Sequence, residues 1–280
     1  MASQAPPSRS FEIAIVGGGI SGLTLAISLL QHNIPVTIYE AARHFGEIGA
    51  GVGFGPNSVL AMELMSPTLK AAFDKFKTSN RASKRNTWFT VRVGDERKAN
   101  SEGYVSGDKK VGDPLYDVEL NTPHGNGGVF RAHFLDELVK SVPDGITKFG
   151  KKLVDMRTLD DGSGDTVLQF ADGSEARHNT VIGCDGIKSM TRKWLLGRDD
   201  PASKAIFSGK YAYRGLIPMD EASDMLGEEV ASNSQIYLGY NGHVLTFPIE
   251  KGKTMNGELP NLRPGSPRWT NPCSGGIQLL

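Results

Sequence analysis

Residues 11–40 read FEIAIVGGGISGLTLAISLLQHNIPVTIYE, and they give the clearest indication of the fold. Its first six residues are almost continuously apolar, as in a buried parallel strand. Three glycines follow, and Ile20, Leu23 and Ile27 then recur at helical spacing along one face. A second strand-like run follows at 36–40. Strand, glycine turn, helix and strand within about thirty residues predict a βαβ unit with a right-handed crossover.

The glycine turn matches the G-x-G-x-x-G pattern of dinucleotide-binding sites at Gly17, Gly19 and Gly22. We expect Gly17 to permit the tight turn, Gly19 to let a pyrophosphate approach the backbone, and Gly22 to let helix and sheet pack closely. The helix N-terminus then offers N–H groups and a positive dipole end to the phosphates. Glu40 ends the second strand, where a carboxylate accepts hydrogen bonds from both ribose hydroxyls of an adenosine. The alternative is a glycine turn beside an exposed glutamate, but the strand–turn–helix context favours dinucleotide binding.

The segment after Glu40 separates two possible cofactors. A nicotinamide-binding domain would usually continue with a further βαβ element. Residues 46–57, GEIGAGVGFGPN, instead predict a glycine-dense loop. A backbone with so few side chains can lie against a long, extended cofactor, which favours FAD over NAD. We expect Asn57 or Ser58 to cap the helix that follows.

The rest of the chain mixes strands with one further clear helix. That helix is expected to begin near Arg131 and to stop before Pro143. Asp172-Gly173 predicts a hairpin turn, and 180–182 predicts an apolar strand that runs into Gly-Cys-Asp-Gly. From about residue 205 the pattern becomes strand-rich, which predicts a second, sheet-based domain.

Composition excludes several classes of function. Lys and Arg number 31, as do Asp and Glu, so the formal net charge is zero and nucleic acid is not an expected partner. The two cysteines and six histidines show no metal-ligand spacing, and we expect no metal. Neither a signal peptide nor an apolar run of roughly 18 residues is present, which predicts a cytoplasmic protein without a transmembrane segment.

Four segments, taken in order, resemble the FAD-dependent aromatic-ring monooxygenases of the salicylate hydroxylase-like and para-hydroxybenzoate hydroxylase-like family: YEAARHFGEIGAGVGFGPN, FRAHFLDELV, VIGCDGIKSMTR and YAYRGLIPM. The resemblance covers about residues 10–256. It implies an α/β fold with a Rossmann-like FAD-binding domain and a smaller sheet-based substrate domain. It also implies FAD as cofactor, NAD(P)H as reductant, and hydroxylation of a small salicylate-like or phenolic aromatic by O2.

Composition, strand pattern and the resemblance together predict that the chain divides into four parts. These are a disordered N-terminus (1–10), an FAD-binding domain (11–80 and 110–200), a substrate domain (81–109 and 201–256) and an irregular tail (257–280). The tail holds four glycines and four prolines without helical or strand period. The family's later Gly-Asp and Ala-Ala-His motif, which contacts the flavin, has no counterpart after residue 256, so we expect a C-terminally truncated, impaired monooxygenase. The alternative is a catalytically inactive nucleotide-binding fragment, and a dehydrogenase that uses NAD alone is a third reading.

Roles for individual residues follow from the same resemblance. Gly17, Gly19, Gly22 and Glu40 correspond to the ADP-binding positions, and Gly53 corresponds to a backbone position that contacts the flavin.

Three charged residues complete the implied site. Arg131 corresponds to an arginine that reaches FAD, with a solvated helix-start arginine as the alternative. Asp185 corresponds to the second nucleotide-binding motif, with simple helix capping as the alternative. Arg214 corresponds to an arginine beside the substrate's phenolic oxygen, where a cation favours phenolate; its alternative is a strand arginine paired with an acid. Relatives pair this arginine with a tyrosine, but the matching position here is Phe247, which weakens the phenolate reading.

Overall fold

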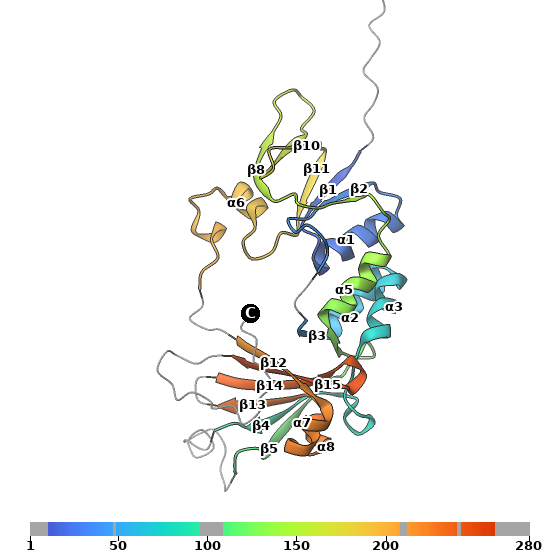
Figure 1. The fold of residues 1–280 in the computed structure, drawn as a ribbon, viewed down its shortest axis with the longest axis vertical. Helices are drawn as coiled ribbons and strands as arrows, with labels where there is room; N and C mark the ends of the chain where they lie inside the picture. Colours follow the sequence, from blue (N-terminus) through green and yellow to red (C-terminus); the bar gives the residue numbers. More distant parts are fainter. Residues whose placement is uncertain (1–10, 47–48, 96–108, 208–211, 240–241, 261–280) are drawn as a thin grey trace, which may run out of the picture. The chain divides into compact units, whose positions relative to one another are not determined.

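A computed structural model of the chain describes residues 11–46, 49–95, 109–207, 212–239 and 242–260 (Figure 1). The chain divides into two compact units. The first comprises Met1–Gly46 and Leu135–Ile206, and the second comprises Glu47–Phe134 and Phe207–Leu280. The predicted disorder of residues 1–10 and irregularity of residues 261–280 concern segments outside the described residues.

The first unit is built on a parallel sheet with the strand order β11-β1-β2-β7. A second, antiparallel sheet has the order β10-β9-β8. The elements of this unit are β1 (Ile13–Val16), α1 (Ile20–Gln31), β2 (Val36–Tyr39), most of α5 (Arg131–Lys140), β7 (Thr147–Lys148), β8 (Leu153–Thr158), β9 (Thr166–Phe170), β10 (Glu175–His178), β11 (Thr180–Gly183), α6 (Met190–Leu196) and η2 (Pro201–Ser203). The predicted βαβ unit, the hairpin and the strand before Gly-Cys-Asp-Gly are therefore confirmed.

Apolar periodicity explains why α1 lies on this sheet. All four residues of β1 are buried, and Leu23, Ala26 and Ile27 bury one face of the helix. Tyr39 and Phe170 stack in the core between the two sheets of this unit, with ring centroids 4.7 Å apart.

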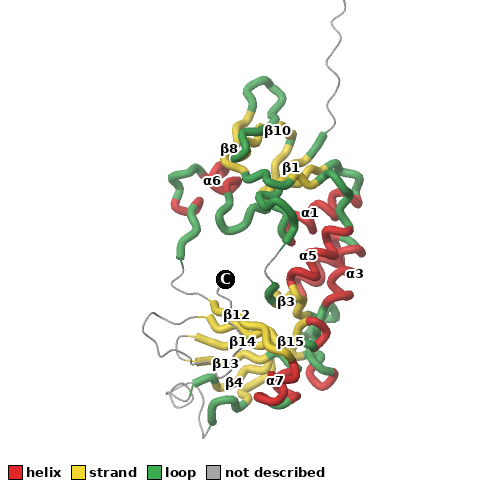
Figure 2. The backbone as a smooth tube through the Cα atoms, viewed as in Figure 1, coloured by secondary structure: helices red, strands yellow, loops and turns green. Residues whose placement is uncertain are grey.

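The second unit is built on a six-stranded sheet with the order β12-β15-β14-β13-β4-β5, visible as adjacent yellow strands in Figure 2. Only the β13–β4 pairing in it is parallel. The elements of this unit are β3 (Gly51–Phe54), α2 (Pro56–Met65), α3 (Pro67–Phe76), η1 (Ala82–Lys84), β4 (Thr87–Val93), β5 (Pro114–Glu119), β6 (Gly127–Phe130), β12 (Ala212–Pro218), α7 (Met219–Leu226), α8 (Glu228–Ala231), β13 (Gln235–Gly239), β14 (Gly242–Ile249), η3 (Glu250–Gly252) and β15 (Thr254–Pro260).

The two faces of this sheet are covered differently. Helices α7 and α8 cover one face, where Ala222, Ala231 and Met255 form a buried apolar cluster. Strands β3 and β6 pair with each other as an antiparallel ribbon, and β6 lies against β14 on the other face, where a Cβ at Gly128 would meet the ring of Phe247. The second unit is therefore strand-rich, as predicted, with a glycine-containing ribbon packed on its sheet.

Three local predictions are wrong. The segment 46–57 is not a loop throughout, because its centre forms β3 and pairs with β6. The helix after it begins at Pro56, with Gly55 at the N-cap in place of Asn57 or Ser58, because proline is well suited to the first helical position. Regular structure also continues past residue 256, since β15 pairs with β12 as far as Pro260.

The compact units also divide the chain differently from the predicted domain bounds. Residues 49–80 and 110–134, predicted to belong to the FAD-binding domain, lie in the second unit. The physical reason is the β3–β6 ribbon, which packs on the six-stranded sheet. The assignment of an FAD-binding and a substrate-binding role to the parts of the chain stays a prediction.

Candidate functional site

In the glycine turn between β1 and α1, Gly17 and Gly22 leave no room for a side chain, whereas Gly19 is open. Gly17 has φ +106°, a conformation that favours glycine, and a Cβ there would lie 2.3 Å from the carbonyl oxygen of Cys184. A Cβ at Gly22 would lie 1.9 Å from the carbonyl oxygen of Gly17. A Cβ at Gly19 would meet nothing within 4 Å. Gly19 is also the N-cap of α1 and carries no side-chain capping bond, so the helix N-terminus is reachable over an open backbone.

Glu40 is held against this turn from the end of β2. Its Oε2 accepts a hydrogen bond from the backbone N–H of Gly18 (2.6 Å), and its Oε1 accepts one from Ala42 (2.7 Å). Each carboxylate oxygen has a further lone pair, which could accept a ribose hydroxyl. Gly18 was not singled out from the sequence, although a Cβ there would lie 2.9 Å from the ring of Phe45 and 3.0 Å from Glu40 Oε2. The only sequence signal for it is the run of three glycines.

Asp185 follows β11 in the same unit, and its carboxylate organises the start of α6. It accepts hydrogen bonds from the hydroxyls of Ser189 and Thr191 (both 2.7 Å) and from the backbone N–H groups of Met190 (2.6 Å) and Thr191 (3.1 Å). Burial raises the pKa of this carboxyl, but the hydrogen bonds from Ser189, Thr191 and Met190 outweigh it and lower the pKa. The capping alternative is therefore present in the structure. A nucleotide contact with this carboxylate would have to displace one of these bonds.

Asp185 and the glycine turn are neighbours. The backbone N–H of Cys184 donates to the carbonyl oxygen of Val16 (2.7 Å), and the close approach of Gly17 to Cys184 completes the contact. The first unit thus brings together Gly17, Gly19, Gly22, Glu40 and Asp185, five of the residues predicted from the sequence.

The other three predicted residues lie in the second unit. Gly53, in β3, is exposed and opposite Gly128 of β6, and a Cβ there would meet nothing within 4 Å. Arg131 begins α5, and its backbone N–H donates to Ala50 (3.0 Å). Burial, and secondarily the charge of Arg214, lowers the pKa of Arg131, so these two guanidinium groups are within electrostatic reach of each other.

Arg214 lies on β12 and forms an ion pair with Glu258 of β15, with 3.4 Å between Nη2 and Oε1. This is the alternative arrangement considered for it, a strand arginine paired with an acid. Phe247 is 7% exposed. Its ring carries no hydroxyl that could partner a phenolate, so the departure from the relatives' tyrosine is also a chemical one.

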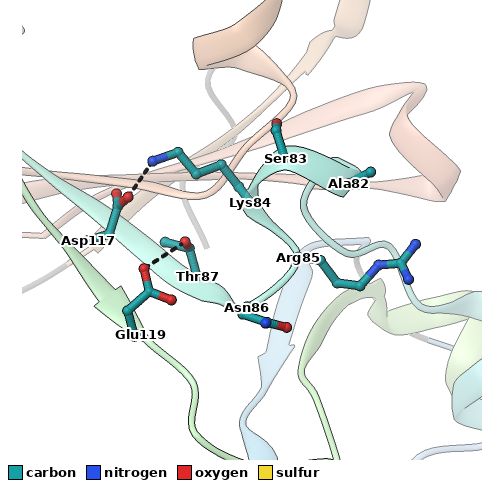
Figure 3. A pocket seen from close by; sticks show the side chains of 8 residues that line it. All are labelled: Ala82, Ser83, Lys84, Arg85, Asn86, Thr87, Asp117 and Glu119. Atoms are coloured by element: carbon teal, nitrogen blue, oxygen red, sulfur yellow. Dashed lines mark hydrogen bonds and ion pairs between the residues drawn. The ribbon is translucent and has the colours of Figure 1, made fainter.

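The second unit also contains a polar pocket (Figure 3). It has a volume of about 510 Å³ and is lined by Ala82, Ser83, Lys84, Arg85, Asn86, Thr87, Asp117 and Glu119. Lys84 forms an ion pair with Asp117, which also accepts a hydrogen bond from Thr90 (2.6 Å). None of the predicted site residues lines this pocket, and two of its four charged side chains, Lys84 and Asp117, pair with each other.

Two further predictions concern metals and membranes. Within the described residues, no cluster of three or more His, Cys, Asp or Glu side chains could hold a metal ion. Across the same parts of the chain, no helix is both long and apolar enough to cross a membrane.

Comparison with known proteins agrees with this geometry. The family model of an NAD(P)-binding Rossmann-like domain matches residues 15–51. The chain is 41% identical over 273 residues to FAD-dependent monooxygenase orf3 of Aspergillus niger, covering 93% of this chain and 58% of that protein. It is 43% identical over 268 residues to 6-methylsalicylate 1-monooxygenase atA of Aspergillus terreus, covering 95% of this chain and 56% of that protein. The chain thus spans somewhat more than half the length of the curated relatives it matches.

Solved structures give the same answer for the fold. A salicylate hydroxylase substrate complex superimposes with a TM-score of 0.68 at 29% identity, over 92% of this chain and 58% of that one. HpxO of Klebsiella pneumoniae, complexed with FAD and uric acid, superimposes with a TM-score of 0.70 at 22% identity, over 91% and 57%. The predicted α/β fold with a Rossmann-like domain is confirmed, and so is the resemblance: the homologues of this chain are FAD-dependent monooxygenases, salicylate hydroxylase among them.

Proposed function

We propose that this chain is the FAD-binding and substrate-binding part of an FAD-dependent monooxygenase that uses NAD(P)H and O2 to hydroxylate a small aromatic substrate, salicylate-like or phenolic. The observation that carries the proposal is the glycine turn, where Gly19 is open and the Glu40 carboxylate accepts from the backbone N–H of Gly18. The names of the relatives support the reaction class. Cytoplasmic localisation, expected from the sequence, is part of this proposal.

The residues of the first unit fit the ADP half of FAD. The open backbone at Gly19 leaves room for a pyrophosphate above the N-terminus of α1, whose N–H groups and dipole favour an anion. Glu40 would accept the ribose hydroxyls while keeping its bonds to Gly18 and Ala42. Asp185 would contribute indirectly, because its carboxylate already accepts hydrogen bonds from the start of α6, beside the glycine turn.

For residues of the second unit, the family resemblance implies contacts with the flavin and with the substrate. The exposed backbone at Gly53 offers a surface without side-chain obstruction for a flat ring system. Arg131 would donate hydrogen bonds to cofactor oxygens. Arg214 would hold an anionic or phenolic oxygen of the substrate, exchanging its long contact with Glu258 for a shorter, charge-assisted one.

FAD, once reduced by NAD(P)H, supplies the chemistry that activates O2 and delivers oxygen to the ring. The protein's part is to bind and orient cofactor and substrate and to exclude water from the reacting centre. Because the relatives extend well beyond the matched region, the activity of this chain by itself is expected to be impaired. The alternative is a nucleotide-binding fragment without catalysis.

Turnover of the purified chain with NAD(P)H and salicylate-like aromatics tests this proposal. Hydroxylated product and hydrogen peroxide are measured together. FAD-dependent NAD(P)H oxidation, with more peroxide than hydroxylated product, is the expected result for an impaired oxygenase. FAD binding without any NAD(P)H oxidation would favour the inactive fragment, and tightly coupled hydroxylation would contradict the expected impairment.

A further inference from the structure

Asn256, on β15, connects the six-stranded sheet to the β3–β6 ribbon. It is fully buried, with 0% of its surface exposed, and its Oδ1 accepts a hydrogen bond from the backbone N–H of Gly51 (2.9 Å). The backbone N–H of Gly51 is therefore satisfied by a side chain from a strand some two hundred residues farther along the chain. A bond of this kind fixes where the start of β3 lies on the sheet.

The contact leaves no room for a side chain at Gly51. A Cβ there would lie 2.7 Å from Cγ of Asn256, closer than such atoms normally approach. The neighbouring strand of the ribbon makes a similar contact, where a Cβ at Gly128 would lie 2.7 Å from Cδ2 of Phe247. Phe247 and Asn256 are register partners on β14 and β15. Gly51 and Gly128 of the ribbon therefore pack directly on this cross-strand pair. The hydrogen bond between Asn256 and Gly51 fixes the position of the ribbon on the sheet.

The amide of Asn256 is only half satisfied. Nδ2 of Asn256 is buried without a hydrogen-bond partner among the described residues. Since Oδ1 must face the Gly51 N–H, the amide cannot be turned over to satisfy it. A buried donor left in this state is unfavourable, so Asn256 carries a cost in accepting from Gly51, whereas an apolar side chain of similar size would leave the buried Gly51 N–H without its acceptor.

We propose that Asn256 is a positioning residue that fixes the glycine strand β3, and with it the exposed backbone of Gly53, relative to the strands that carry Arg214 and Glu258. The connection is direct, because β15 pairs with β12 at Leu216↔Asn256 and Arg214↔Glu258. This inference rests on the proposed function only in taking Gly53 as a flavin contact. The position of β3 itself is a property of the chain without cofactor.

The first test is hydrogen–deuterium exchange of the full chain without FAD, followed by mass spectrometry of peptides that cover β3. Asn256→Leu removes the acceptor at similar size and is expected to speed exchange at Gly51 about fivefold or more, the factor for one lost hydrogen bond. Gly51→Ala should do the same from the ribbon side, even if Asn256→Leu does not fold. Thr246→Val is the matched control, because its buried Oγ1 also has no partner within the described residues but lies on β14, away from β3.

The second test separates positioning from general stability. Each variant is saturated with FAD, and the visible absorption spectrum of the bound flavin is compared with that of the unaltered chain. Asn256→Leu and Gly51→Ala should shift the flavin bands, and Thr246→Val should not. If the exchange rate of β3 in Asn256→Leu and in Gly51→Ala equals that of the unaltered chain, the proposal is overturned. Faster exchange with an unshifted spectrum would reduce Asn256 to a structural residue and would overturn it also.

A chain that binds no FAD would count against the proposed function, and the exchange result would still decide whether Asn256 positions β3.

Discussion

Substitutions at Gly19 and Gly22 should separate cofactor binding from folding, although the two glycines lie in the same turn. At Gly19 an added side chain meets open space, and the backbone (φ −73°, ψ −174°) is an extended conformation that any residue adopts. Gly19→Val should therefore fold, with only the loss of a preferred N-cap residue, about 1 kcal/mol or less. Its side chain would occupy the space through which a pyrophosphate reaches the N–H groups of α1.

Gly19→Val is expected to weaken FAD binding, and Gly22→Ala is expected to lower folding stability. Charge-assisted hydrogen bonds contribute about 1.5–3 kcal/mol each, so the loss of two from the pyrophosphate weakens FAD binding by about 3–6 kcal/mol, or roughly 10²- to 10⁴-fold. Gly22→Ala should act in the opposite way. Its Cβ would lie 1.9 Å from a backbone oxygen, where contacts under 3.0 Å are essentially never seen, so α1 must shift. Overpacking of this kind typically costs about 1–3 kcal/mol or more of folding stability.

The assays are urea unfolding for stability and titration with FAD, followed by flavin fluorescence, for binding. Gly19→Val should retain most of the stability and lose FAD, whereas Gly22→Ala should lose stability. Normal FAD affinity in Gly19→Val would refute the assignment of this turn to the cofactor. Unchanged stability in Gly22→Ala would refute the packing argument.

The remaining predictions concern three charged residues. Asp185 has a lowered pKa in the folded chain, so its bonds to α6 should stabilise the fold above about pH 4, and this stabilisation should be lost as the pH falls through the folded pKa. In urea unfolding, the Asp185→Asn variant should be less stable than the unaltered chain at pH 7, and its stability should depend less on acid pH. Glu40→Gln keeps the size but can no longer accept from both Gly18 and Ala42, so it should weaken FAD binding and lower stability by about 1 kcal/mol, measured by the same two assays. The change that matches Arg214→Ala in a full-length relative should weaken substrate affinity or slow hydroxylation in steady-state kinetics, by an amount equivalent to about 1.5–3 kcal/mol. The change that matches Glu258→Gln is the control and should affect neither. If the Arg214→Ala enzyme is unaffected, this arginine does not belong to the site.

The parts of the fold that the sequence predicted well are those in which apolar period and turn chemistry agree. The run from Ile13 to Tyr39 is one example, since its strands are continuous and its helix buries one face. The hairpin at Asp172-Gly173 is another, because Gly173 takes the positive φ that the turn requires.

The errors occur where pairing is long-range. Glycines at 51 and 53 suppress the local signal for β3, which exists because β6 pairs with it more than seventy residues later in the chain. The end of β15 has a composition typical of a loop and is held by β12. The bond between Asn256 and Gly51 likewise has no local sequence signature, because it joins two strands from opposite ends of the second unit.

For the candidate site, the motif gave the residue types but not their contacts. The pattern placed Glu40 at the ribose, yet only the structure shows it bonded to Gly18 and Ala42. Asp185 matched a nucleotide motif, and its carboxylate is occupied by α6. Such contacts depend on side-chain geometry across a turn, which spacing alone does not encode.

Competitive titration of the purified chain with FAD and NAD tests whether the glycine turn is an FAD site. We expect one FAD to bind per chain through the glycine turn, with a change in flavin fluorescence on binding and only weak competition by NAD. An absence of FAD binding, or tighter binding of NAD than of FAD, would contradict this expectation.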